Sequence, residues 1–294
     1  MNRRQQRPSS TQVVPALPTA PAENLELGPL VSFNHRVPAK VIAIANQKGG
    51  VGKTTTAVNL AACLAAVGKR ILFIDLDPQA NATSGLGIEK VAGASAYRPL
   101  LGEGALTGKI QRTAYDRLDI IPSEVDMCGA EIEVSRLENH LHRLRHAVEP
   151  LRNGGQHELI LVDCPPSLGI LTLNAFAAAD FLIVPLQCEY YALEGVAMIN
   201  RLLNQLRESG ANRHLELLGV LMTMFDGRTN LSHQVVGEVR QHFGPVVFDT
   251  VIPRTTRLAE APSFGKPIIY YDKYSTGAAA YEVLTQEVLG RLKS

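Results

Sequence analysis

Two lysines, three glycines and a run of threonines stand together in residues 46–59, NQKGGVGKTTTAVN, and these residue types suit the binding of phosphate. The segment follows a strand-like apolar run at 41–45 and leads into a helix-like run at 57–67. Glycines let backbone N–H groups converge on phosphate oxygens, and a helix N-terminus adds free donors and a favourable dipole. The residues predicted to surround the phosphates of a nucleotide are Lys48, Gly49, Gly50, Val51, Gly52, Lys53, Thr54 and Thr55.

The loop differs from the standard phosphate-binding pattern in one informative way. In G-x-x-x-x-G-K-[ST] the first glycine would stand at position 47, but this chain has Gln47 followed by Lys48. Lys53 fills the usual lysine position and is expected to reach the β- and γ-phosphates, while the Thr54 hydroxyl is expected to bind Mg²⁺. Lys48 is therefore an additional cation placed just before the glycines.

Carboxylates follow two further apolar runs. ILFIDLDPQ places Asp75 and Asp77 at the end of one run, and LILVDCPPS places Asp163 at the end of another. Aspartates at strand ends beside a phosphate loop can order Mg²⁺ with its water shell or position an attacking water. We expect Asp75 and Asp163 to serve the metal and Asp77 to orient the water, with Lys48, Lys53 and Asp77 as the catalytic set.

The apolar runs alternate with helical stretches and show little in/out alternation, as parallel strands covered on both faces do. This rhythm predicts an α/β fold with a doubly wound, mostly parallel sheet flanked by helices, and with ligands at the carboxyl ends of the strands. The predicted strands are 41–45, 71–75, 159–163, 181–186, 217–225 and 267–271. The predicted helices are 53–67, 124–148, 168–178, 192–208, 231–242 and 276–292.

Composition divides the chain and limits its partners. Residues 1–38 are rich in Pro, Ser, Thr and Gln without periodicity, which predicts a disordered tail before a single domain at 39–294. A formal net charge of +1 predicts no global attraction to nucleic acid, so DNA would have to bind a local basic patch. The four cysteines form no C-x-x-C pair, and no apolar run is long enough to span a membrane. These features indicate a cytoplasmic protein.

Five segments together identify a family resemblance. KGGVGKT resembles the deviant Walker A motif of the ParA/MinD class of P-loop ATPases, in which a signature lysine precedes the glycines. FIDLDPQ resembles the A-prime motif of that class, and LVDCPPS resembles its Walker B motif. The likeness continues through MTMFDGRTN and VIPRTTRLAEAPSFGKPI, covers roughly residues 39–290, and is similar to the chromosomal ParA (Soj) branch in particular. The resemblance implies a P-loop NTPase fold with ATP and Mg²⁺ as cofactors.

The resemblance also implies a switch. Lys48 would cross to the γ-phosphate bound by a second subunit, so that ATP forms a sandwich homodimer. The dimer would bind double-stranded DNA non-specifically and associate with the nucleoid, and a ParB-type centromere-binding protein would stimulate slow hydrolysis. Arginines would contact DNA phosphates, with Arg228, Arg254 and Arg257 as the candidates, and the loop around Pro253 would hold the adenine.

Other functions on the same scaffold were weighed. An electron-transfer ATPase would need cluster cysteines, and the contexts of Cys128 and Cys164 do not match that class. A biosynthetic amidoligase would lack Lys48. A MinD-like membrane switch needs a basic amphipathic C-terminal helix, whereas AYEVLTQEVLGRLKS is typical of a docking helix. A ParA relative that positions a plasmid or another cargo stays open.

Overall fold

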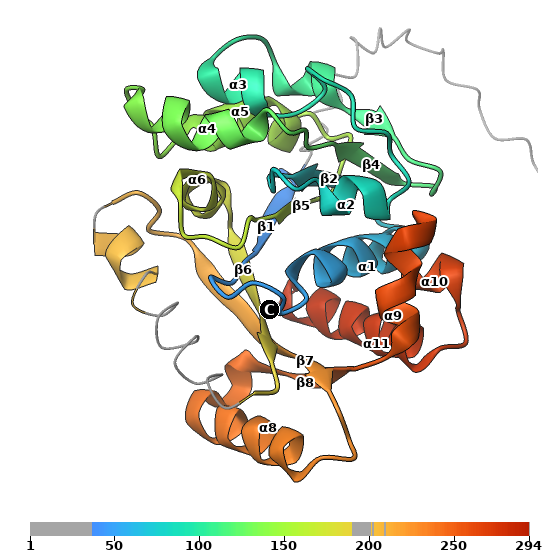
Figure 1. Ribbon diagram of the computed structural model, residues 1–294. Helices are drawn as coiled ribbons and strands as arrows, with labels where there is room; N and C mark the ends of the chain where they lie inside the picture. The colour runs from blue at the N-terminus through green and yellow to red at the C-terminus, as the bar shows by residue number, and fades with distance from the viewer. Residues whose placement is uncertain (1–36, 190–200, 202, 209, 294) are drawn as a thin grey trace, which may run out of the picture. The chain divides into compact units, whose positions relative to one another are not determined.

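The computed structural model describes residues 37–189, 201, 203–208 and 210–293, and these form an eight-stranded sheet with helices on both faces (Figure 1). The strand order is β3-β4-β2-β5-β1-β6-β7-β8. Within the described residues the neighbouring strands are parallel, except for the antiparallel pair β3–β4. The strands are β1 (Lys40–Ile44), β2 (Ile71–Asp75), β3 (Gln111–Arg112), β4 (Leu118–Ile121), β5 (Leu159–Asp163), β6 (Phe181–Gln187), β7 (Glu216–Phe225) and β8 (Val247–Pro253).

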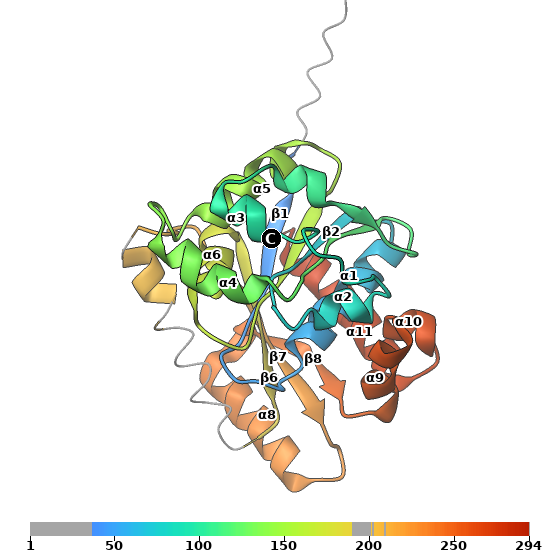
Figure 2. The same cartoon turned by 45° about the horizontal axis from the view of Figure 1, so that its top comes forward.

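Two apolar layers cover the sheet, one on each face. Helices α1 and α11 pack on one face, with Leu60, Leu64 and Tyr281 fully or almost fully buried. Helices α5, α6 and α8 cover the opposite face (Figures 1 and 2). The α-helices are α1 (Lys53–Ala66), α2 (Asn81–Gly85), α3 (Tyr97–Leu101), α4 (Met127–Glu133), α5 (Arg143–Asn153), α6 (Ile170–Ala178), α8 (Asn230–Phe243), α9 (Thr256–Glu260), α10 (Ile268–Tyr271) and α11 (Thr276–Arg291). The doubly wound α/β fold predicted from the sequence is confirmed.

One predicted strand is wrong. The run at 267–271 forms α10, a single helical turn, because Ile268 N donates to Asn59 Oδ1 at 2.6 Å and Tyr271 N donates to Pro267 O at 3.0 Å. A five-residue apolar run does not by itself distinguish a strand from a helical turn.

One predicted helix is interrupted. The stretch 124–148 contains α4, a 3₁₀ turn at Val134–Arg136 and the first half of α5. Asn139 has a φ of 54°, which an α-helix does not accommodate, so the chain turns there before α5 begins. Strands β3, β4 and β8 were not among the predicted runs.

Two predictions fall largely on residues outside the described part of the chain. These are the tail at 1–38 and most of the helix at 192–208; residues 203–208 of the latter are helical. Residues 36–294 form one compact unit by their contacts, and the boundary at 38/39 stays a prediction.

Candidate nucleotide site

The loop between β1 and α1 is held open by glycine conformations and anchored to two other strands. Gly50 and Gly52 have φ of 75° and 84°, in the left-handed region that favours glycine. Asn46 Nδ2 donates to Pro185 O on β6 at 2.7 Å, and Thr223 Oγ1 on β7 donates to Val51 O at 2.8 Å. The backbone of the loop is thus fixed before any ligand arrives.

The two lysines of the loop lie in different surroundings. Lys53 is 6% exposed and donates from Nζ to Lys48 O at 3.0 Å. Burial lowers the pKa of Lys53, and the carboxylates of Asp163 and Asp77 act in the opposite direction. The Lys48 side chain is about half exposed, and its Nζ lies 2.6 Å from Glu189 Oε2. Lys53 therefore belongs to the floor of the loop, whereas Lys48 projects from it.

Asp75 and Asp163 stand side by side, because β2 and β5 pair in parallel with these two residues in register. Both are fully buried. Asp75 accepts hydrogen bonds from Thr83 N at 2.9 Å, Thr83 Oγ1 at 2.7 Å and Asp77 N at 3.1 Å. Burial raises the pKa of Asp75 to about 6, and its hydrogen bonds with Thr83 and Asp77 oppose that shift.

Asp163 has none of this support. Neither of its carboxylate oxygens has a hydrogen-bond partner among the described residues. Burial first, and the Asp75 carboxylate next, raise the pKa of Asp163 well above its usual range. The Thr54 hydroxyl is near enough to lower that pKa, although it does not make a regular hydrogen bond. A buried, unpartnered carboxylate beside a threonine hydroxyl fits Mg²⁺, which prefers hard oxygen ligands and one or two carboxylates.

Asp77 lies two residues beyond the end of β2. It is 6% exposed, and its Oδ1 accepts from Gln79 N at 3.0 Å. This hydrogen bond holds one carboxylate oxygen in the turn after β2 and thereby orients the second oxygen. This arrangement suits a carboxylate that positions a water molecule.

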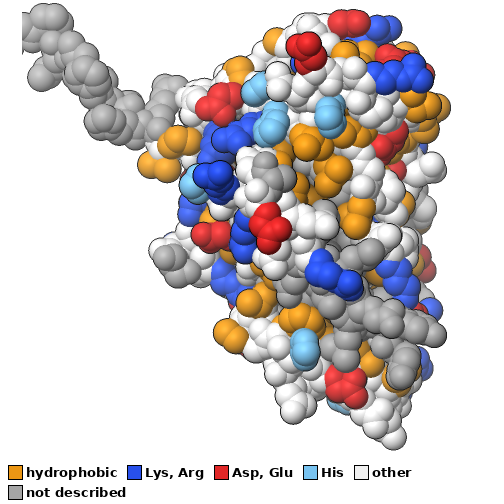
Figure 3. Space-filling model, turned by 90° about the vertical axis from the view of Figure 1, so that its left-hand side faces the viewer, with side chains coloured by type: hydrophobic (Ala, Val, Ile, Leu, Met, Phe, Trp, Pro, Cys, Tyr) orange, Lys and Arg blue, Asp and Glu red, His pale blue; other side chains and the backbone are white. Residues whose placement is uncertain are grey.

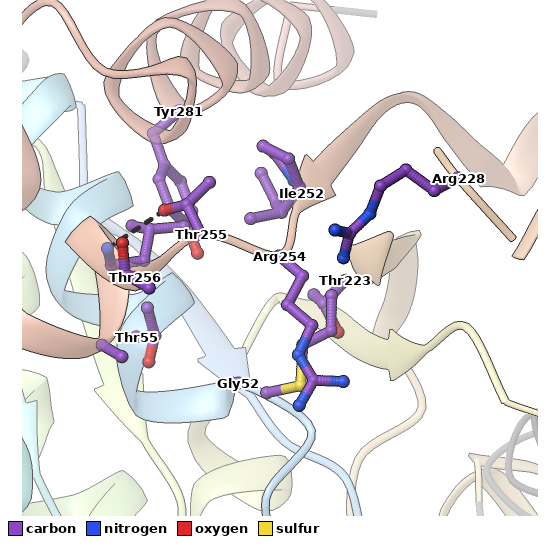
Figure 4. Close-up of a pocket in the computed structure, with 13 residues that line it drawn as sticks. Gly52, Thr55, Thr223, Arg228, Ile252, Arg254, Thr255, Thr256 and Tyr281 are labelled. Carbon is purple, nitrogen blue, oxygen red and sulfur yellow. Dashed lines mark hydrogen bonds between the residues drawn. The ribbon is translucent and has the colours of Figure 1, made fainter. Parts of the chain in front are cut away.

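A cavity of about 520 Å³ adjoins the loop at Gly52 and Thr55 (Figure 4). Pro253, the candidate for the base-binding loop, lies in its wall together with apolar side chains including Ile252 and Leu258. A mostly apolar slot beside a phosphate site has the character of a pocket for a planar base.

The three candidate arginines do not lie together. Arg228 and Arg254 both line this cavity, and Figure 4 shows their guanidinium groups on the same side of it. Arg228 makes a two-pronged pair with Asp226, at 2.9 and 2.7 Å, and this pairing lowers the pKa of Asp226. Arg254 makes no side-chain hydrogen bond or ion pair to the residues that the structure describes.

Arg257 lies outside this cavity, on α9. Its guanidinium is 3.1 Å from Glu260 and 3.4 Å from Asp272. Figure 3 shows another face, where Lys and Arg side chains gather along one margin with His, Asp and Glu among them. In the histidine-rich segment 140–146, His142 Nε2 lies 3.1 Å from Ala211 O.

Sequence reasoning missed Glu189 and Thr83. Glu189 stands two residues beyond β6, at the same edge of the sheet as the loop, so the rule of carboxyl strand ends could have found it. Thr83 gives no such signal, because its contact with Asp75 depends on the short helix α2 folding back onto β2.

A strand, a glycine turn, a buried lysine at a helix start and an unpartnered strand-end aspartate together define a P-loop NTPase with a deviant Walker A loop. A family model described as "AAA domain" matches residues 39–217. "Chromosome partitioning protein ParA" of Caulobacter vibrioides is 49% identical over 255 residues, which cover 86% of this chain and 95% of that protein. "Sporulation initiation inhibitor protein Soj" of Bacillus subtilis is 51% identical, covering 85% and 98%. The chain belongs to the ParA/Soj family, and it is an ATPase.

A solved structure agrees with this fold. The protein described as cobyrinic acid a,c-diamide synthase from Mycobacterium smegmatis, with bound ADP and magnesium, superimposes with a TM-score of 0.75 at 35% identity. The match covers 87% of this chain and 96% of that one. None of the helices in the described part of the chain has the length and apolar character needed to cross a bilayer.

Proposed function

We propose that this ATPase is an ATP-dependent DNA-partitioning switch, which dimerises around bound nucleotide and binds DNA as the dimer. One observation carries the proposal: the two loop lysines are separated in role, since Lys53 is buried under the loop and Lys48 is held outside it by Glu189. An ATPase acting alone has no evident use for an outward-facing second lysine. Contact with the γ-phosphate of ATP bound by a partner subunit would give Lys48 a role.

In this proposal the chain binds Mg-ATP with residues already in place. Lys53 exchanges Lys48 O for phosphate oxygens, and Thr54 with Asp163 would hold Mg²⁺, which when bound supplies positive charge to the phosphates. Asp77 orients the attacking water, and the cavity beside Pro253 takes the adenine. No described group stands ready as an arginine finger, so hydrolysis is expected at the unassisted rate of about 10⁻⁴–10⁻² s⁻¹ until a ParB-type partner accelerates it.

Dimerisation then depends on an exchange of ion pairs. Lys48 Nζ must leave Glu189 before it reaches the phosphate of the other subunit. An exposed ion pair of this kind contributes little, about 0–1 kcal/mol, so a triphosphate with several negative oxygens competes effectively for the lysine. ADP lacks the γ-phosphate, so it offers Lys48 no contact that would compensate for the loss of its ion pair with Glu189.

DNA binding follows from dimerisation. The monomer carries Arg228, Arg254 and Arg257 on a chain with a formal net charge of only +1. Two copies double these phosphate contacts and steepen the salt dependence. The dimer would contact the phosphate backbone of the nucleoid without reading bases, and the monomer would return to the cytoplasm. The names of the relatives support the chromosome, rather than a plasmid or another body, as the cargo.

The C-terminal helix argues against a membrane switch. Arg291, near the end of α11, donates to Leu218 O at 2.8 Å, Val246 O at 3.0 Å and Val247 O at 2.9 Å. Leu284 and Val288 of the same helix are fully buried. A helix docked in this way is not free to insert into a bilayer.

Light scattering combined with calorimetry tests the proposal. Mg-ATP should double the mass of the wild-type protein, and Lys53→Ala should show no heat of nucleotide binding. Lys48→Ala should bind Mg-ATP and stay monomeric. Lys69→Ala is the matched control, because Lys69 forms a similar half-exposed pair with Glu158 at 2.9 Å; it should dimerise normally. Normal dimerisation of Lys48→Ala would refute the proposed role of Lys48.

A further inference from the structure

A second polar cavity lies at the opposite end of the sheet from the phosphate loop. It is formed where β2, β4 and β5 begin, beside the edge strand β3, and its volume is about 510 Å³. Its charged or titratable lining side chains are Arg70, Arg112, Asp116, Arg117, Asp119 and His157, and we call it the amino-end cavity. The roles proposed above leave this cavity without a function.

A buried histidine–aspartate pair forms its floor. His157 is 4% exposed, and its Nε2 lies 2.9 Å from Asp119 Oδ2. The other two polar atoms of the pair, His157 Nδ1 and Asp119 Oδ1, are buried without a hydrogen-bond partner among the described residues. Arg112 Nη1 lies 3.4 Å from that Asp119 oxygen, within ion-pair range only. Buried polar atoms without partners are uncommon, and they indicate a bound group that completes them.

Arg117 contributes a second, independent sign. Its φ of 62° lies in the left-handed region, where glycine or asparagine would be accommodated at lower cost. The backbone is held there because Arg117 O accepts from Ile71 N at 2.8 Å in the sheet. A strained position filled by a long cationic side chain points to a use for that side chain.

The guanidinium groups around the cavity are poorly satisfied. Arg117 lies 3.6 Å from Asp116 and 3.4 Å from Gly68 O, both long contacts. The Asp116 side chain is 94% exposed and so neutralises little of the local charge. The structure gives Arg70 no side-chain hydrogen bond or ion pair among the described residues, although it lines the cavity. Nearby Glu158 is paired with Lys69 at 2.9 Å, and the charge of Arg70 contributes with Lys69 to the lowered pKa of Glu158.

We propose that the amino-end cavity binds a small dianion, the phosphate group of a phosphorylated small molecule or the free ion. Three arginines outnumber the two aspartates, and they offer the forked donors that suit tetrahedral oxyanions. His157 Nε2 stays on Asp119, and Nδ1, which has no partner among the described residues, is the ring atom left to hydrogen-bond the ligand. The site is independent of the phosphate loop and of dimerisation.

The first test is an NMR titration of the full chain with sulfate, which stays dianionic from pH 5.5 to 8. The ring nitrogens of His157, assigned with His157→Gln, should shift saturably, and Arg70→Ala should weaken binding about tenfold or more. In calorimetry His157→Gln, which keeps a polar side chain but removes the ring, should also weaken sulfate binding. The absence of a saturable shift at millimolar sulfate would overturn the proposal.

Arg117→Gly separates binding from folding. Because glycine relieves the left-handed strain, the melting temperature should stay equal or rise, while sulfate affinity falls about tenfold. Arg98→Ala is the matched control, since Arg98 is a similarly exposed arginine paired with Glu103 at 2.7 Å, and it should bind sulfate normally. Unchanged affinity in Arg117→Gly would show that the cluster is only structural.

A competition series identifies the source of the phosphate. Inorganic phosphate and glycerol phosphate should displace sulfate, and the tighter of the two defines the class of natural ligand. A DNA oligonucleotide, whose phosphodiesters carry a single charge each, should not compete. Displacement of sulfate by DNA at the same phosphate concentration would overturn the assignment to a small dianion.

Discussion

Two neighbouring strand ends at the nucleotide site differ in how completely the chain satisfies them. At the end of β2, Asp75 accepts three hydrogen bonds from its own polypeptide. At the end of β5, Asp163 is equally buried and accepts none from the part of the chain that the structure describes. The same contrast recurs among the arginines, since Arg257 forms ion pairs with two carboxylates, whereas Arg254 forms none with the described residues and only adds its charge near Asp226. Groups completed inside the chain hold the site together, and groups left open are those that a ligand can complete.

The strongest way to break this contrast is to remove each aspartate in turn. Asp75→Ala leaves two buried donors of Thr83 and the Asp77 N–H without an acceptor, and should lower the free energy of unfolding by about 4 kcal/mol. Asp163→Asn replaces a buried carboxylate that accepts no regular hydrogen bond from the described residues, so stability should stay equal or rise while Mg-ATP binding is lost. Urea unfolding of both variants at pH 7 checks this. Equal destabilisation by the two substitutions would contradict the contrast.

The pH dependence of stability sharpens it next. The pKa of Asp75 rises from 3.8 to about 6 on folding, so the folded state binds this proton more tightly than the unfolded state. Its contribution is therefore fully present below pH 3.8 and is lost as the pH rises through about 6, a change of about 3 kcal/mol. The pKa of Asp163 shifts in the same direction, so Asp163→Asn should flatten the wild-type curve.

That curve is measured by urea unfolding of the nucleotide-free protein between pH 4 and pH 8. Asp116→Asn is the control, because Asp116 is exposed, and it should reproduce the wild-type profile. The raised pKa values would be contradicted if the stability of the wild-type protein rose with pH over this window and Asp163→Asn left that profile unchanged.

Substitution of Asp77 tests whether the groups that a ligand can complete have separate roles in nucleotide binding and in hydrolysis. Asp77→Ala should keep Mg-ATP bound and lower the hydrolysis rate about 100-fold, because the water loses its orienting carboxylate. The variant should therefore persist as a dimer on DNA. Single-turnover hydrolysis and DNA co-sedimentation measure the two properties, and loss of ATP binding in this variant would place Asp77 among the binding groups instead.

The smallest expected effects are those of truncating a single arginine to alanine. Arg257→Ala should weaken DNA binding by the dimer about tenfold and reduce the salt slope by about 2, one phosphate contact per copy. Arg254→Ala should weaken it at least as much, since Arg254 has no ion pair with the described residues that must break first. Arg257→Glu should abolish DNA binding while ATP-dependent dimerisation survives. Co-sedimentation across a salt series, with Arg98→Ala as control, provides the comparison.

The sequence was sufficient for the parts of the site that lie next to one another along the chain. The phosphate loop, the strand ends with Asp75, Asp77 and Asp163, and the alternation of strands and helices follow from local patterns. Residue pairs that come into contact only in the folded chain could not be predicted from local patterns. Lys48 with Glu189 and Asp75 with Thr83 join separate elements, and no spacing rule connects them. For the same reason, α10 could not be distinguished from a strand without knowledge of its contact with Asn59.

The hydrogen bond from Lys53 Nζ to Lys48 O has a thermodynamic consequence. A lysine side chain free in solvent would lose about 2 kcal/mol of rotamer entropy on being immobilised by a phosphate. Here the ammonium group is already immobilised by the backbone carbonyl of Lys48. When nucleotide binds, Lys53 therefore exchanges one hydrogen-bond acceptor for another. The rotamer entropy of its side chain has already been lost on folding.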